Sequence, residues 1–189
     1  MTQRLVDLML RAAAFLIATR CLLWPTFVVG LGTTMLIATR MRRLEHDTDI
    51  TPLPSPKVLL AVSRVGRAEA LTRRWKRVGC ERVREQVYSD YELIPAYTVT
   101  GILGSLLAAS ALPAGTERVA VGWFLGMLWL GAGVLDAIEN GLLLVVLSPR
   151  PHARWQHAAF AVAAGKWALV ALAGLGTVGA LGGAIWLQR

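Results

Sequence analysis

The sequence has few charged residues: they make up 17% of the chain, whereas 55% of its residues are hydrophobic. A typical soluble domain carries more charge, about a quarter of its residues. The hydrophobic residues also gather into runs of the length that a helix needs to cross a bilayer, about 20 residues. The sequence therefore predicts an all-α fold, a polytopic membrane helix bundle of about four transmembrane helices with a cytoplasmic amphipathic helical segment.

Residues suited to catalysis or cofactor binding are also scarce. The two cysteines, Cys21 and Cys80, belong to no CxxC or Cys/His motif, and we predict that both are free thiols. The sequence contains no P-loop, no dinucleotide-binding fingerprint and no nucleophile with a neighbouring base. His157 is the candidate ligand for a metal, haem or pigment, but no second axial ligand is evident. We predict a protein that is not an enzyme and has no cofactor; haem or pigment binding stays open, and a bound lipid is compatible with the sequence.

Acidic residues are outnumbered, with 12 Asp and Glu against 20 Lys and Arg, which gives a net charge of +8. The excess lies between the hydrophobic runs and in no recognisable nucleic-acid-binding motif. The positive-inside rule and anionic lipid headgroups account for such a distribution. Arginine outnumbers lysine by 17 to 3, which is typical of a high-GC bacterial genome. We therefore predict a protein of the bacterial cytoplasmic (inner) membrane that has membrane lipids, and no nucleic acid, as partners.

The chain divides into four predicted segments. Residues 1–20 form an N-terminal interfacial segment, because apolar residues recur there at helical spacing between charges. Residues 21–39 form the first transmembrane span, and residues 40–90 form a basic cytoplasmic helical segment. Residues 91–189 form a three-helix transmembrane region, with spans expected at 93–113, 119–147 and 158–187.

The distribution of basic residues predicts the orientation of the spans. Segment 40–90 holds 12 Arg and Lys residues, several of them on a helix expected over 68–89. Loop 148–157 carries two arginines, whereas loop 114–118 carries one. Because basic segments remain in the cytoplasm, segment 40–90 and loop 148–157 are predicted to be cytoplasmic and both termini to lie outside.

Small residues at a spacing of four mark expected helix contacts. Gly122 and Gly126 in the third span, and Gly179 and Gly183 in the fourth, form GxxxG motifs. In lipid, such residues allow two helix backbones to approach closely. We expect these glycines to pack helices of one chain together, and contact with a second copy of the chain is the alternative.

Polar residues also occur inside the hydrophobic spans: Asp136, Glu139 and Asn140 in the third, and Lys166 in the fourth. A charge at the middle of a helix in lipid costs about 2.5–3.5 kcal/mol, so such groups face other helices and find partners. If the chain turns near Pro151, residues 136 and 166 lie at equal depth, because each residue adds the same rise. The sequence therefore predicts an ion pair between Asp136 and Lys166, and it leaves Glu139 without a basic partner.

A second set of polar residues is expected near these groups, at the start of the second span: Asp90, Tyr91, Tyr97 and Thr100. Glu139 could be protonated, accept a hydrogen bond from Asn140, Tyr97 or Thr100, or bind a ligand. Two interpretations of the cluster stay open. It is either a structural polar clasp, or a proton or ion pathway or ligand site.

Two stretches carry a resemblance to known proteins: Asp90-Tyr91-Glu92-Leu93-Ile94-Pro95-Ala96-Tyr97 and Leu135-Asp136-Ala137-Ile138-Glu139-Asn140. With Lys166, they resemble a loose group of small, uncharacterised bacterial four-helix integral membrane proteins. The likeness covers roughly residues 52–172. It implies the four-helix layout and the named polar residues as a set, and it implies no biochemical activity.

These features predict a non-catalytic integral membrane protein, an accessory or assembly subunit of a larger membrane complex that binds other proteins. The alternative is a small transporter or proton-conducting bundle that uses Asp136, Glu139 and Lys166, although no internal repeat is evident. A third hypothesis, a membrane enzyme acting on lipids, ranks last because the sequence offers neither a nucleophile with its base nor a metal cluster.

Overall fold

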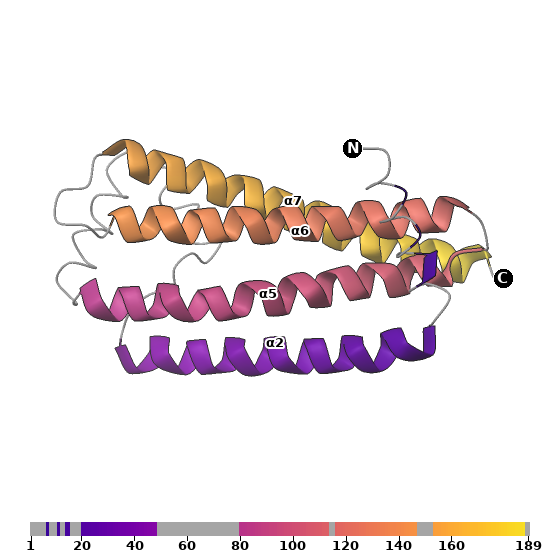
Figure 1. Cartoon of the computed structure of the whole chain (residues 1–189), viewed down its shortest axis with the longest axis horizontal. Helices are drawn as coiled ribbons and strands as arrows, with labels where there is room; N and C mark the ends of the chain where they lie inside the picture. Colours follow the sequence, from indigo (N-terminus) through magenta and orange to yellow (C-terminus); the bar gives the residue numbers. More distant parts are fainter. Residues whose placement is uncertain are drawn as a thin grey trace. The chain divides into compact units, whose positions relative to one another are not determined.

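The computed structural model has four long α-helices in the residues that it describes (Figure 1). They are α2 (Arg20–Thr48), α5 (Cys80–Ala111), α6 (Thr116–Val146) and α7 (Ala153–Leu187). The structure describes residues 7, 11, 14, 15, 20–48, 80–113, 116–146 and 153–187. Most of the predicted interfacial segment 1–20 and the part of the basic segment over 49–79 lie outside the described residues.

Each of the four helices is long and apolar enough to cross a membrane. The candidate spans are Cys21–Met41, Val87–Ala111, Glu117–Val146 and Arg154–Trp186. The predicted all-α fold with four transmembrane helices is confirmed, and the chain is a multi-pass membrane protein by helix length and hydropathy. The last two spans contain 30 and 33 residues. A bilayer needs about 20, so these helices tilt or extend beyond the hydrocarbon.

The second span begins earlier than the sequence indicated. We expected one helix to end near residue 89 and a separate span at 93–113, but α5 is continuous from Cys80. No glycine or proline occurs between Cys80 and Ile94, so no residue there interrupts the helical hydrogen bonds. The expected span 93–113 left Asp90 and Glu92 outside, yet both lie inside the candidate span Val87–Ala111. Asp90 can lie inside the span because it has a hydrogen-bond partner on α6, described below.

The chain forms two compact units, and each helix contributes one segment to each unit. Unit 1 consists of Met1–Thr33, Ala96–Ala132 and Ala168–Arg189, and unit 2 consists of Thr34–Pro95 and Gly133–Trp167. Unit 1 contains an apolar cluster, whereas unit 2 buries several charged side chains.

The helices of unit 1 pack through apolar and small residues. Leu23, Leu106 and Ala109 are buried together at its core. Gly101 of α5 lies against the indole of Trp129 of α6, and a Cβ atom at position 101 would overlap that ring. A hydrogen bond of 3.2 Å between the hydroxyl groups of Ser105 and Thr177 links α5 to α7. The close approach of α5 and α6 therefore depends on the absence of a side chain at position 101.

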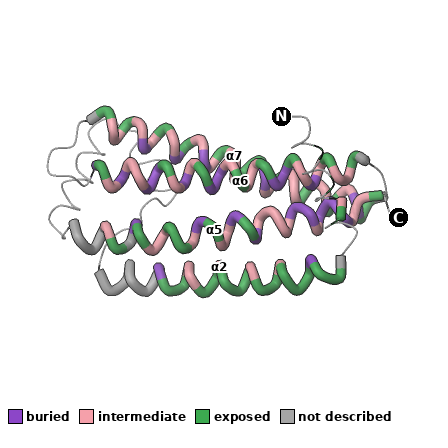
Figure 2. Tube along the Cα trace, in the orientation of Figure 1, coloured by how far each residue is buried: buried purple, intermediate pink, exposed green. Residues whose placement is uncertain are grey.

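Burial is very uneven among the four helices, as the colours of Figure 2 show. In the most apolar 18-residue stretch of each helix, only 6% is buried in α2 and 11% in α7, against 44% in α5 and 33% in α6. The exposed threonines of α2, Thr26, Thr33 and Thr39, each donate a hydrogen bond to a carbonyl of their own helix. Their hydroxyl groups are therefore satisfied without water, as a surface that faces lipid requires.

The four GxxxG glycines differ in their surroundings. Gly122 and Gly126 are buried, and a Cβ atom at Gly126 would lie 3.6 Å from the side chain of Ile102 on α5. A Cβ atom at Gly179 or Gly183 meets nothing within 4 Å. In the described part of the chain, a side chain at either position would therefore have open space around it, and helix packing by these two glycines stays a prediction.

Candidate functional site

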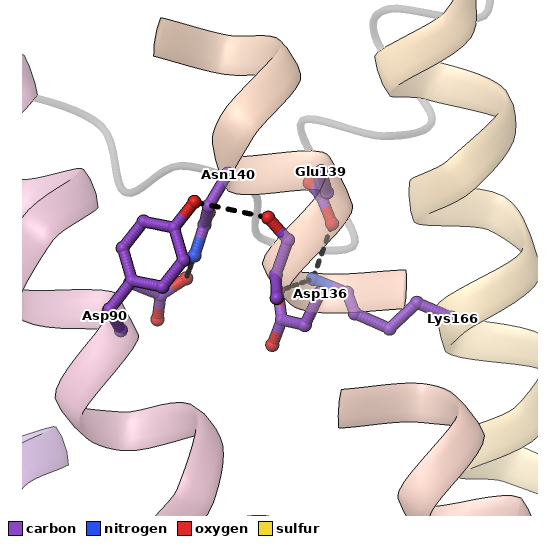
Figure 3. A network of polar contacts seen from close by, with 7 residues as sticks. Asp90, Asp136, Glu139, Asn140 and Lys166 are labelled. Atoms are coloured by element: carbon purple, nitrogen blue, oxygen red, sulfur yellow. Dashed lines mark hydrogen bonds and ion pairs between the residues drawn. The ribbon is translucent and has the colours of Figure 1, made fainter. Parts of the chain in front are cut away.

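Lys166 of α7 reaches two carboxylates of α6 at once (Figure 3). Its Nζ atom lies 2.7 Å from Oδ1 of Asp136 and 2.6 Å from Oε2 of Glu139. The predicted ion pair between Asp136 and Lys166 is confirmed. The expectation that Glu139 lacks a basic partner is wrong, because residues three apart on a helix lie on the same side and one ammonium group can reach both.

These ion pairs are buried inside unit 2. The side chains of Lys166, Asp136 and Glu139 are 6%, 7% and 2% exposed. By contrast, Arg40 and Glu92 form a pair of 3.6 Å whose side chains are 70% and 60% exposed. Exposed pairs of that kind contribute at most about 1 kcal/mol, whereas removing one member of a buried pair leaves a charge that nothing offsets. The Lys166 bridge therefore links α6 to α7 through side chains that depend on each other for charge compensation.

A hydrogen bond joins α5 to the same region of α6. Nδ2 of Asn140 donates to Oδ2 of Asp90 over 2.8 Å, and Asn140 is almost fully buried. One residue further along α5, the hydroxyl group of Tyr91 donates to the carbonyl oxygen of Ala137 over 3.1 Å. Asn140 was an expected donor to Glu139, but its amide is directed to Asp90. Asp90 can lie inside a span because it has this partner.

We call Asp90, Asp136, Glu139, Asn140 and Lys166 the polar network. Three helices contribute to it: α5 provides one carboxylate, α6 provides two carboxylates and the amide, and α7 provides the amine. The amine and the carboxylates can hold the helices together and can exchange protons. Asp90 is only partly buried, whereas the other four residues are buried. Asp90 is thus the member through which the network is most accessible.

The other residues that the sequence singled out lie in different surroundings. Tyr97 and Thr100 belong to unit 1. There the ring of Tyr97 meets that of Trp129 edge-on, with centroids 6.5 Å apart, and the hydroxyl group of Thr100 donates to the carbonyl of Ala96. His157 is exposed on α7. Among the described residues, no group of three or more His, Cys, Asp or Glu side chains could hold a metal ion.

Sequence reasoning missed one acceptor of the site, the backbone carbonyl of Ala137. A main-chain acceptor leaves no signal in the residue type, so no feature of the sequence pointed to it. Comparison with known protein families, curated proteins and solved structures finds no match for this chain. The resemblance to a group of bacterial four-helix membrane proteins therefore stays a prediction.

Proposed function

We propose that this chain is a non-catalytic integral membrane protein that serves as an accessory or assembly subunit of a larger membrane complex. The observation that supports this function best is the open face of α7. Only 11% of the most apolar 18-residue stretch of this helix is buried. Gly179 and Gly183 lie on this helix, and a Cβ atom at either position would meet nothing within 4 Å. Small residues favour close contact between helices in lipid, so a transmembrane helix of another protein fits there.

The location of the complex is part of this proposal. We place it in the bacterial cytoplasmic membrane, with segment 40–90 in the cytoplasm and both termini outside, on the basis of the basic residues in that segment. The end of the helices that carries Arg40, Arg84 and Arg154 then faces anionic lipid headgroups. Protein partners within the membrane and lipids at this end are the expected contacts.

Replacement of both glycines tests the proposed contact. We expect Gly179→Leu with Gly183→Leu to reduce severalfold the partner protein recovered with the chain in mild detergent, because two bulky side chains prevent close approach of a helix. The measurement is native mass spectrometry of the purified complex. Gly32→Leu on α2 is the matched control, since a Cβ atom there also meets nothing within 4 Å. A wild-type protein found only as a 20.5 kDa monomer, or only as a homo-oligomer, would contradict the subunit function.

A second candidate function is a small transporter or proton-conducting bundle. The composition of the polar network favours it, because three carboxylates and one amine are gathered on three helices inside the candidate spans. Ionisable groups at such depth commonly belong to proton relays and ion pathways. For this function, Glu139→Gln should abolish proton flux into proteoliposomes, whereas Glu92→Gln at the exposed ion pair should leave it unchanged. Flux that Glu139→Gln does not alter removes the second candidate.

A further inference from the structure

We propose that Asp136 and Glu139 share one proton, so that together with Lys166 they form an electrically neutral proton-binding site inside the membrane. The geometry that points to this site is the contact of both carboxylates with a single nitrogen atom, at 2.7 and 2.6 Å. The inference does not depend on the proposed subunit function, since it concerns only the charge state of these three side chains.

The balance of one ammonium group against two carboxylates implies a bound proton. One ammonium group offsets one carboxylate, so two ionised carboxylates would leave an uncompensated negative charge among side chains that are at most 7% exposed. The two carboxylates contact the same Nζ atom, and two carboxylates in one site disfavour double ionisation. A single proton held by either carboxyl group removes both the repulsion and the excess charge.

No second buried cation among the described residues supplies the missing positive charge; Arg84 of α5 and Arg118 of α6 are only half-buried, and Arg118 belongs to unit 1. The one member of the polar network on α5, Asp90, is a further acid, bound to Asn140. From α2, the described side chains of unit 2 include one charged group, Arg40, which is exposed and paired with Glu92. On α7, Arg154 and His157 are exposed. Lys166 is the one buried cation among the described residues.

We expect the shared proton to exchange on the least buried side of the network. Asp90 is the most accessible acid of the five residues, and Asn140, which donates to it, is next to Glu139 in the sequence. Proton exchange with water is therefore expected from the end of the helices that carries Asp90.

Infrared spectroscopy of the protein in lipid bilayers at neutral pH tests the proposal. A protonated carboxyl group gives a C=O stretching band that moves to lower frequency in D₂O. We expect this band in the wild type, and we expect its complete loss in Asp136→Asn and in Glu139→Gln, because the single remaining carboxylate then pairs one-to-one with the ammonium group. Glu85→Gln and Glu92→Gln, which replace exposed carboxylates of α5 outside the polar network, are the controls, and both should retain the band.

The absence of the band from the wild-type protein overturns the shared proton, and this result requires no variant. Its persistence in either Asp136→Asn or Glu139→Gln also overturns the proposal, because the proton would then belong to a different acid. Retained helicity and a single chromatographic peak identify the variants that are folded.

Discussion

Lys166→Met should destabilise the folded protein by about 3–5 kcal/mol, the effect expected when one partner of a buried charge cluster is removed. The methionine side chain has a similar length and leaves Asp136 and Glu139 facing each other without an ammonium group. The fraction unfolded in a titration of detergent micelles with a denaturing detergent measures this loss.

Neutralisation of the carboxylates should restore part of the stability that Lys166→Met removes. Asp136→Asn with Lys166→Met should be more stable than Lys166→Met alone. The triple variant that adds Glu139→Gln should be more stable still, because it strands no charge in the membrane. Equal stability of the single, double and triple variants would contradict the role of the bridge, since that result means that no side chain depends on the charge of another.

The second large effect is expected at Gly101, where α5 meets the indole ring of Trp129. Gly101→Val should destabilise unit 1 by about 1–3 kcal/mol, the usual effect of adding atoms to a packed interior. The added side chain would overlap the ring, so α5 and α6 must separate or Trp129 must change its rotamer. The same unfolding titration measures the effect, and the fluorescence of the protein reports on the tryptophan environment.

Gly182→Val is the matched control for this substitution. Position 182 is also in a helix, and a Cβ atom there meets nothing within 4 Å. Both variants therefore change helix propensity equally, and only Gly101→Val adds a steric overlap. Comparable losses at the two positions would show that backbone effects, and not contact with Trp129, account for the change.

The fold could be predicted from the sequence because its strongest signal is hydrophobic run length. Runs long enough to cross a bilayer occur in each of the four helices, and the confirmed spans follow from them. The start of α5 could not be placed in this way. Charged residues such as Asp90 and Glu92 mimic a membrane boundary, and the hydrogen bond that lets Asp90 lie inside the span comes from a residue 50 positions away.

Part of the site could also be predicted from the sequence, because the rise per residue of a helix is regular. Equal distance from the turn between α6 and α7 places Asp136 opposite Lys166, so the depth of the pair can be calculated from helical rise alone. Rise does not determine how far a flexible lysine side chain extends or which of two neighbouring carboxylates it meets. The double contact with Glu139 therefore required coordinates. The open surroundings of Gly179 likewise depend on which helices cover α7, and a GxxxG pattern does not contain that information.

The bridge from Lys166 to two carboxylates is tested most directly by solid-state NMR of the protein in lipid bilayers. Labelling lysine with ¹⁵N at Nζ marks only three residues of the chain, and Lys166→Met assigns the signal of position 166. With ¹³C-labelled Asp and Glu, the Lys166 nitrogen should show strong dipolar couplings to one Asp and one Glu carboxyl carbon, and Asp136→Asn and Glu139→Gln should each remove one of them. Couplings that place both carboxyl groups beyond about 6 Å, outside the range of a direct charge partner, would contradict the bridge.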